Sequence, residues 1–197
     1  TLFVITIAVP QFVSLLLMRN FLNDHGPLNG LLQTLHLTNG PIPFLTDPLW
    51  AKFSIIFVNM WIGIPFTMLV ATGIIMNLPT EQIEAAEIDG ASKFQIFKSI
   101  TFPQILLIMA PSLIQQFIGN INNFNVIYFL TGGGPKNSEY YQAGSTDLLV
   151  TWLYKLTVSA KDYNLASVIG ILIFAISATF SLLAYTRSSS FKEGAAK

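Results

Sequence analysis

Long apolar runs are the feature that most limits what this chain can fold into. Four stretches, residues 1–22, 51–78, 103–130 and 164–185, carry few charged side chains. A helix needs about 20 apolar residues to cross a hydrocarbon layer about 30 Å thick. The 197-residue chain is 52% hydrophobic and only 10% charged, whereas soluble domains carry about 25% charged residues. The sequence therefore predicts an all-α, polytopic transmembrane helical bundle.

The connecting segments have their own patterns. Pro10 lies inside the first run, and membrane helices tolerate proline, so we expect a kinked span there. Residues 23–49 are dense in Gly, Pro, Asn and Asp, which predicts a loop with a short interfacial helix at 28–36. A second loop, 131–163, contains STDLLVTWLYKL, which favours an amphipathic surface helix. We treat 1–197 as one membrane domain that lacks its N-terminal part, because no signal-peptide pattern opens it.

Charge and metal-ligand chemistry exclude several partners. The chain has ten basic and ten acidic residues, so no polybasic stripe indicates a nucleic-acid partner. Lys and Arg divide five against five between the two sides, which leaves the orientation in the membrane open. Cysteine is absent from the sequence, and the two histidines, His25 and His36, have no further ligands at suitable spacing. We expect no metal site.

The most polar stretch of any length, residues 84–103, lies between the second and third apolar runs, largely within a loop at residues 79–102. Thr80 can cap a helix, with Glu81, Glu84 and Glu87 expected near its positive end. Gly90 should end that helix. The sequence predicts the first arm of an elbow outside the bilayer.

The second arm of the elbow should begin with Ser92 as its cap. Phe94 and Phe97 then recur at helical spacing and form an apolar stripe. Exposed aromatic side chains outside a membrane need cover. Either a partner protein covers them, or the stretch is an ordinary loop packed on its own bundle.

A stripe of amides marks the third run. Gln116, Asn120 and Asn123 are spaced i, i+4 and i+7, so they share one face of a helix. Amides in hydrocarbon cost several kcal/mol unless they find partners, so this stripe should face the bundle interior or a wet cavity. Amides suit sugar hydroxyls, but they also serve as hydrogen-bonding contacts between helices. On the second run, one face carries Asn59, Ile62, Gly63 and Phe66.

The polar stretch EAAEIDGASKFQIFKSITFP resembles the EAA loop of ABC importer permeases. Glu84-Ala85-Ala86, Gly90, Ile100 and Phe102-Pro103 stand at the spacing of that motif. Downstream, NINNFNVIYFLTGGGP and AGSTDLLVTWLYKL resemble the carbohydrate importers, in particular the larger maltose/maltodextrin permease subunit. The likeness covers nearly the whole chain. Since the family core has six spans, it implies that N-terminal spans are missing.

This resemblance implies a mechanism and a set of partners. Residues 81–101 would dock on a separate ATPase subunit near its Q-loop, and ATP-driven closure would switch the permease between inward-facing and outward-facing states. Residues 79–102 and the C-terminus would lie on the cytoplasmic side of a bacterial cytoplasmic membrane. The implied partners are a second permease in a heterodimer, two ATPases and an extracytoplasmic sugar-binding protein. The coupling residues would be Glu84, Ala85, Ala86, Gly90, Phe94 and Phe97.

The chain itself is expected to be a transport subunit, not an enzyme, and to hold no cofactor. ATP and Mg would bind the partner ATPases. The segment TGGGPKNS lacks the G-x-x-x-x-G-K-[ST] spacing that cradles phosphate.

The resemblance also implies which residues line the sugar path. The matching positions are Ile62, Gly63, Phe66, Gln116, Asn120 and Asn123. Phe66 stands where the maltose type commonly has Tyr, and Gln116 where it has a small hydroxyl residue, which puts the chain-length preference in doubt. Asn122 and Asn125 point away from the stripe and are assigned to packing. Maltose or maltodextrin is the expected substrate, with another oligosaccharide or glycoside as the alternative.

The residues of the four runs also bear on three other classes of protein. A secondary transporter or channel would need Asp, Glu or His inside the spans for ion coupling, and the four runs contain none. A membrane-embedded enzyme would need a convergent acid, base or metal group, whereas these runs supply amides and hydroxyls. A structural scaffold conflicts mainly with the elbow motif.

Overall fold

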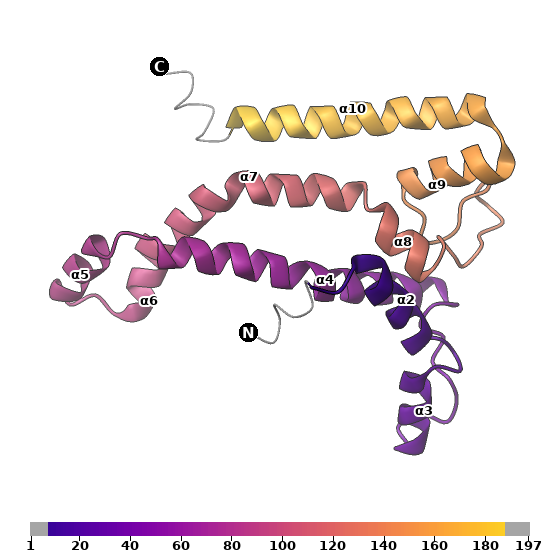
Figure 1. The fold of residues 1–197 in the computed structure, drawn as a ribbon, viewed down its shortest axis with the longest axis horizontal. Helices are drawn as coiled ribbons and strands as arrows, with labels where there is room; N and C mark the ends of the chain where they lie inside the picture. Colours follow the sequence, from indigo (N-terminus) through magenta and orange to yellow (C-terminus); the bar gives the residue numbers. More distant parts are fainter. Residues whose placement is uncertain (1–7, 188–197) are drawn as a thin grey trace.

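Three long helices lie side by side in the computed structural model, which describes residues 8–187 (Figure 1). Stretches long and apolar enough to cross a membrane are Pro48–Met76, Lys93–Ile121 and Tyr163–Ala184. They belong to α4 (Pro48–Met76), to the α6–α7 stretch and to α10 (Tyr163–Arg187). No strand forms within residues 8–187, where the one β-bridge joins Lys136 and Gly144. The expected all-α, multi-pass fold is confirmed.

The first apolar run differs from the expected kinked span. Its described part holds α2 (Gln11–Phe21), and residues 1–7 of the expected span lie outside the described range. Pro10 precedes α2 as its N-cap residue instead of kinking a helix from within. A proline lacks the backbone N–H, so it is better tolerated at a helix start than inside one. Leu15 anchors α2 because its side chain is fully buried.

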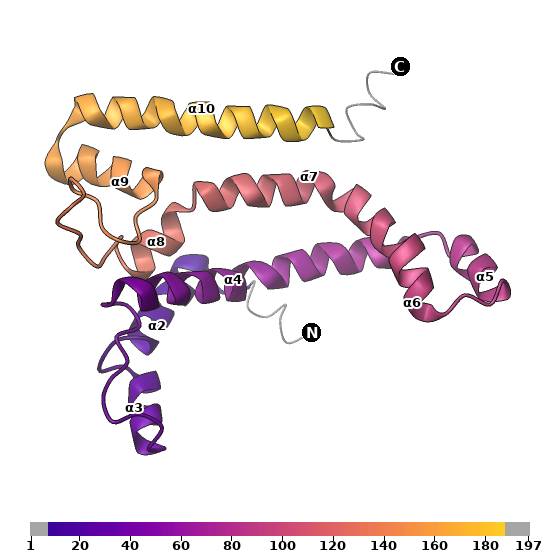
Figure 2. The same cartoon turned by 180° about the vertical axis from the view of Figure 1, so that it is seen from behind.

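The loop after α2 contains the short helix that the sequence predicts. This helix, α3 (Pro27–Thr34), stands roughly across the direction of the long helices (Figures 1 and 2). The side chain of Asn29 is buried and holds the loop in place. Its Oδ1 accepts from the Ile42 N–H at 2.8 Å, and its Nδ2 donates to the Ile42 carbonyl at 3.0 Å. One buried amide thus closes the loop.

The helix α4 begins at a strong cap and continues through a proline. Asp47 Oδ1 accepts from the backbone N–H groups of Leu49 at 2.9 Å and Trp50 at 3.0 Å. Pro65 lies within the 29-residue helix without ending it. A cluster of buried side chains joins this helix to α2 and α8; its members are Leu15, Leu22, Val58, Val126 and Leu130.

The third run does not form one span to residue 130. The helix α7 (Phe102–Ile121) ends before two asparagines, and α8 (Phe124–Leu130) sets off in a new direction (Figure 1). Asn123 causes the break, because its Oδ1 accepts from the Val126 N–H at 3.3 Å and so caps α8. The prediction of a span reaching Leu130 was therefore wrong.

The same run begins earlier than the sequence suggests. The helix is continuous from α6 (Lys93–Ile96) through a π-helical turn, η1 (Phe97–Thr101), into α7. Pro103 lies in the first turn of α7, as expected. Since proline has no N–H to donate and its ring crowds the preceding turn, the wider π turn accommodates it without breaking the helix.

A compact cap follows α8 at one end of the molecule. The helix expected in STDLLVTWLYKL is present as α9 (Leu149–Lys155), followed by the π-helical η2 (Leu156–Ala160). Leu149, Trp152 and Leu153 pack against Leu156 and against α10, so α9 is part of the bundle. Tyr128 of α8 and Tyr154 of α9 meet with ring centroids 5.2 Å apart. Their hydrogen bond raises the pKa of Tyr154 above its ordinary value.

The long helices leave most of their surface uncovered. In the apolar stretches of α4, of the α6–α7 stretch and of α10, the buried share is 17%, 11% and 11%. Such apolar surface needs lipid or other protein helices around it. The described residues therefore form part of a larger membrane assembly of lipid, protein or both.

Candidate functional site

The polar stretch between α4 and α7 folds as an elbow, which we call the coupling elbow (residues 81–101) after the role that the resemblance to the EAA loop implies. Its first arm, α5 (Glu81–Ile88), ends at Gly90, which has φ of 79°. The Ala91 N–H donates to the Ala86 carbonyl at 3.0 Å, and the Gly90 N–H donates to the Glu87 carbonyl at 3.1 Å. These two bonds form a Schellman motif, which places a left-handed residue at this position. The prediction that Gly90 ends the helix is confirmed.

The second arm begins with a full capping box. Ser92 Oγ accepts from the Gln95 N–H at 3.4 Å, and Gln95 Oε1 accepts from the Ser92 N–H at 2.8 Å. The prediction of a Ser92 cap is thus confirmed. Thr80 holds the N-cap position of α5, but its side chain makes no capping bond.

The charges on α5 divide between its two ends. Glu81 and Glu84 lie in the first turn, where the positive end of the helix dipole favours a carboxylate. Glu87 lies in the last turn, so the expectation of three glutamates near the positive end was wrong for this residue. The first arm has only eight residues, or about two turns. Glu87 therefore lies at the opposite end of the helix from Glu81.

Apolar side chains protrude from the elbow. Phe94 is 71% exposed and Phe97 49% exposed. Phe97 makes one ring contact, with Phe102 at 5.8 Å between centroids. Ile88, which the sequence analysis did not single out, is 86% exposed. It could have been found as the last apolar residue before the glycine. The described part of the chain does not cover these side chains, which argues against a loop packed on its own bundle.

The elbow lies at the far end of the molecule from α8 and α9 (Figures 1 and 2). Gln104 Nε2 donates to Gln82 Oε1 and so ties α5 to the start of α7. The first arm is therefore connected to a membrane-length helix both by the peptide chain and by a side-chain hydrogen bond. A force on the elbow would reach α7 directly.

A second group of candidate functional residues lies where α4 meets the end of α7. We call it the amide cluster: Asn59, Gln116, Asn120 and Asn123. Asn59 Nδ2 donates to Asn120 Oδ1 at 2.9 Å, and Asn123 Nδ2 donates to Asn59 Oδ1 at 2.8 Å. The sequence analysis placed Asn120 and Asn123 on one stripe, and the structure brings both onto Asn59. Asn123 does so as the cap of α8, not as part of a continuous span.

Gln116 is held by two hydroxyls. Thr67 Oγ1 donates to Gln116 Oε1 at 2.9 Å, and Gln116 Nε2 reaches Ser112 Oγ at 3.4 Å. Neither hydroxyl was identified from the sequence. Ser112 lies four residues before Gln116, so the same helical spacing could have found it.

The amides thus link α4 to the end of α7 within the described residues. This is the interhelical hydrogen-bonding role that the sequence leaves open beside sugar binding. They also retain capacity for a ligand. Asn120 is exposed, and no partner of its Nδ2 group is found within residues 8–187. Gly63 and Phe66 lie nearby on α4 and are exposed, with Phe66 at 50%. Ile62 instead packs against the buried cluster of α2, α4 and α8.

Two neighbouring asparagines have packing roles, as expected. Asn122 Nδ2 donates to Ser177 Oγ of α10 at 3.0 Å. Asn125 Nδ2 donates to Gln11 Oε1 of α2 at 3.1 Å. Both amides are directed to other helices and away from the cluster.

Comparison with known families decides what kind of protein carries this arrangement. The family model described as "Binding-protein-dependent transport system inner membrane component" matches residues 1–190. The chain belongs to this family. Its membership confirms a multi-pass membrane protein and a transport component in place of an enzyme.

Relatives within this transport family are sugar permeases by name. The chain is 39% identical over 196 residues to the galactooligosaccharides transport system permease protein GanP of Bacillus subtilis (strain 168), covering 99% of this chain and 46% of GanP. It is 38% identical over 198 residues to the maltodextrin transport system permease protein MalC of Streptococcus pneumoniae serotype 4, covering 96% and 45%. The chain spans about half the length of these curated relatives.

Solved structures of the same kind share the fold. A bacterial alginate ABC transporter, crystallised in complex with an alginate pentasaccharide-bound periplasmic protein, matches with a TM-score of 0.77 and 26% identity. The match covers 91% of this chain and 60% of that chain. The permease family and the ABC transporter architecture therefore agree with the helices and the elbow described above.

Proposed function

We propose that the full-length protein is a permease subunit of an ATP-driven ABC importer that translocates a sugar by alternating access. The observation that carries this proposal is the coupling elbow, a rigidly capped polar arm joined to membrane-length helices and bearing uncovered apolar side chains. Membership in the binding-protein-dependent transport family supports it.

The elbow would dock into a cleft on a partner ATPase. Ile88 on the first arm and Phe94 and Phe97 on the second offer apolar contacts, and Glu84 adds a carboxylate on the first arm. Aromatic and aliphatic anchors that become buried carry most of the energy of such interfaces. Ala85 and Ala86 keep the arm narrow. ATP and Mg would be bound by the two ATPases and not by this chain, and residues 79–102 and the C-terminus would lie in the cytoplasm.

The sugar would pass the amide cluster. Asn120 and Asn123 offer amide donors and acceptors, Gln116 extends a longer arm, and Phe66 presents an exposed ring on which a sugar can stack. Ile62 and Gly63 would shape the wall beside them. During passage, sugar hydroxyls would replace the hydrogen bonds that Asn59 makes to Asn120 and Asn123. The amides would then have hydrogen-bond partners both with and without the sugar.

The assembly would need other chains. A second permease would cover the exposed faces of the long helices in a heterodimer, and an extracytoplasmic binding protein would deliver the sugar. The alginate transporter in complex with its periplasmic protein supports the second of these partners.

Maltose or maltodextrin is the proposed substrate. The maltodextrin permease MalC, 38% identical, supports this choice. Galacto-oligosaccharides are a second candidate, since GanP is 39% identical.

Uptake by proteoliposomes that contain the full-length transporter, its ATPases and its binding protein tests the substrate path. We expect Asn120→Ala to lower the uptake of labelled maltotriose about tenfold, because the loss of amide bonds worth about 1.4 kcal/mol changes a rate or affinity by that factor. Asn122→Ala removes an amide from the opposite face of the same helix end and serves as the control. Equal uptake by the two variants would contradict the assignment, and uptake of galacto-oligosaccharide alone would select the second candidate.

A further inference from the structure

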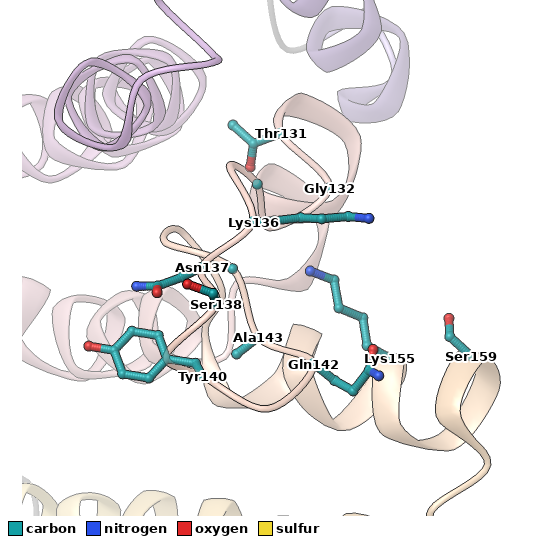
Figure 3. Close-up of a pocket in the computed structure, with 12 residues that line it drawn as sticks. Thr131, Gly132, Lys136, Asn137, Ser138, Tyr140, Gln142, Ala143, Lys155 and Ser159 are labelled. Carbon is teal, nitrogen blue, oxygen red and sulfur yellow. The ribbon is translucent and has the colours of Figure 1, made fainter.

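A polar pocket lies at the end of the molecule opposite the coupling elbow. The loop after α8 folds back onto α9 and leaves a pocket of about 730 Å³ that opens to solvent (Figure 3). Ligand sites in proteins range from about 300 to 1,000 Å³. This volume is sufficient for several sugar units. None of the amide-cluster residues lines the pocket.

Most of the residues that line the pocket carry polar side chains. Side chains that can both donate and accept hydrogen bonds come from Thr131, Asn137, Ser138, Gln142 and Ser159. Lys136 and Lys155 add ammonium donors, and their amino ends both extend into the hollow (Figure 3). None of the twelve residues that line it is acidic. The pocket therefore suits a ligand rich in oxygen acceptors.

Its walls are fixed in place before any ligand binds. The Asp147 side chain, 2% exposed, pairs with Lys155 at 2.5 Å and accepts from the Gly144 N–H at 2.7 Å. The hydroxyls of Thr131 and Thr146 lie 2.9 Å apart. At Gly133, with φ of 80°, a Cβ atom would overlap the Asp147 carboxylate, so the turn and α9 can approach this closely only with glycine there.

The pocket lies close to the proposed sugar path. Thr131 forms part of its wall and follows α8 directly, and Asn123 of the amide cluster is the N-cap residue of α8. Eight residues at 1.5 Å per residue separate the two sites by about 12 Å along that helix. A chain of several sugar units could touch both.

We propose that this pocket is a second saccharide site, which holds the trailing units of an oligosaccharide while its leading units occupy the amide cluster. The inference rests on the proposed sugar transport and extends it. A docking site for a partner protein fits less well, because the lining lacks the buried aliphatic and aromatic anchors that such interfaces use. Tyr140, 56% exposed, is the one aromatic residue of the lining and can stack on a sugar ring.

The test compares long and short sugars in the full-length transporter, reconstituted with its partner subunits and binding protein. In the double variant Asn137→Ala, Gln142→Ala, we expect the half-saturating concentration for maltoheptaose uptake to rise about fivefold, since the two amides would lose hydrogen bonds to the sugar. Uptake of maltose should be unchanged, because a disaccharide is too short to reach from one site to the other. Asn164→Ala removes an exposed amide at the same end of the molecule, outside the pocket, and should change neither sugar.

Three results would overturn the proposal. The first is an equal change for both sugars, which would indicate a defect in folding or delivery. The second is a weaker complex between the variant and sugar-loaded binding protein, measured by surface plasmon resonance, which would make the pocket a protein-docking site. The third is unchanged maltoheptaose uptake. Failure of the proposed function is distinguishable, since the wild-type transporter would then take up neither sugar.

Acidic and neutral sugars both present oxygen atoms that the donors of the pocket can bind. The positive charge of Lys136 would distinguish between them, because only acidic sugars carry carboxylates. Lys136→Gln keeps a hydrogen-bond donor and removes the charge. If it weakens competition by an alginate pentasaccharide more than competition by maltoheptaose, the pocket selects the acidic saccharide; an equal effect selects the neutral one.

Discussion

Gly90 carries a conformational requirement that no other residue type meets without cost. Its φ of 79° completes the Schellman motif that ends α5, and no atom lies within 4 Å of the position that a Cβ would take. The requirement for glycine therefore comes from the backbone alone, not from crowding. It explains in physical terms why the EAA pattern places glycine at that spacing.

Gly90→Ala should weaken the elbow without altering its surface. Forcing alanine into the left-handed region costs about 1–2 kcal/mol, so we expect α5 to fray at its C-terminal end and ATP hydrolysis in the assembled transporter to become less responsive to sugar. Hydrogen exchange of the amides of Gly90 and Ala91 would report the fraying. Gly73→Ala is the matched control, because Gly73 also has open space around its Cβ but lies within α4. Equal behaviour of the two variants would contradict the backbone argument.

The amide cluster makes a prediction about pairwise energies. Asn59 bonds to both Asn120 and Asn123, so a double-mutant cycle of Asn59→Ala with Asn123→Ala should give a coupling energy of about 0.6 kcal/mol, typical of polar pairs within membranes. The measurement is the free energy of unfolding in mixed micelles. Asn59→Ala with Asn125→Ala should be additive, since those two amides make no bond to each other. Additivity in both cycles would mean that the cluster contributes no specific bond.

At the scale of elements, the sequence predicted which segments are helical far better than where they end. The elbow, the caps at Gly90 and Ser92 and the short helices α3 and α9 follow from local turn and capping chemistry, which the sequence carries. The end of α7 depends on Asn123, whose side chain can either join a polar stripe or cap a new helix. Periodicity favours the first, and contacts with α4 and α8 select the second.

Local sequence patterns also fail to predict the start of α7 and the partners of Gln116. Proline at position 103 is compatible with a fresh helix or with a π turn in a continuing one, and only the packing of the elbow separates these. One of the two hydroxyls that hold Gln116 comes from Thr67, 49 residues earlier in the chain. A contact over that separation has no local sequence signal.

The compact region that follows α8 and contains α9 is held together by an ion pair between Lys155 and Asp147. In Lys155→Met, the Asp147 carboxylate would keep its burial and lose its cation, which costs several kcal/mol when such a pair is broken. Because Lys155 is 26% exposed, we expect a loss of about 2 kcal/mol in the free energy of unfolding of the assembled transporter. The double variant with Asp147→Asn should recover part of this loss. A double variant as unstable as Lys155→Met would contradict the role of the pair.

The whole molecule is organised around its two ends. The coupling elbow projects beyond one end of the long helices, and α8, α9 and the loop between them lie at the other (Figures 1 and 2). That loop and α9 supply most of the residues that line the polar pocket. The amide cluster lies between them, where α4 contacts the end of α7. Since α6, η1 and α7 form one continuous helix from residue 93 to residue 121, a rigid displacement of the elbow can move the wall of the amide cluster. Under the proposed function, this continuity would couple ATP hydrolysis in the partner subunits to sugar passage.

The uncovered apolar surface sets what such an assembly needs. With 11–17% of the apolar stretches buried within the described chain, lipid, partner helices or both must cover the rest. Under the proposed function, coupling would therefore require the complete transporter, which is the sample for each test of it.

Sugar-stimulated ATP hydrolysis by the reconstituted full-length transporter, with binding protein and maltotriose present, tests the central claim most directly. The comparison is wild type against Glu84→Lys, with Glu139→Lys as the control because Glu139 is an exposed acidic residue at the opposite end. The account predicts that Glu84→Lys abolishes the stimulation while the complex still assembles, and that Glu139→Lys retains it. Wild-type stimulation in Glu84→Lys would contradict the assignment of residues 81–101 as the coupling elbow.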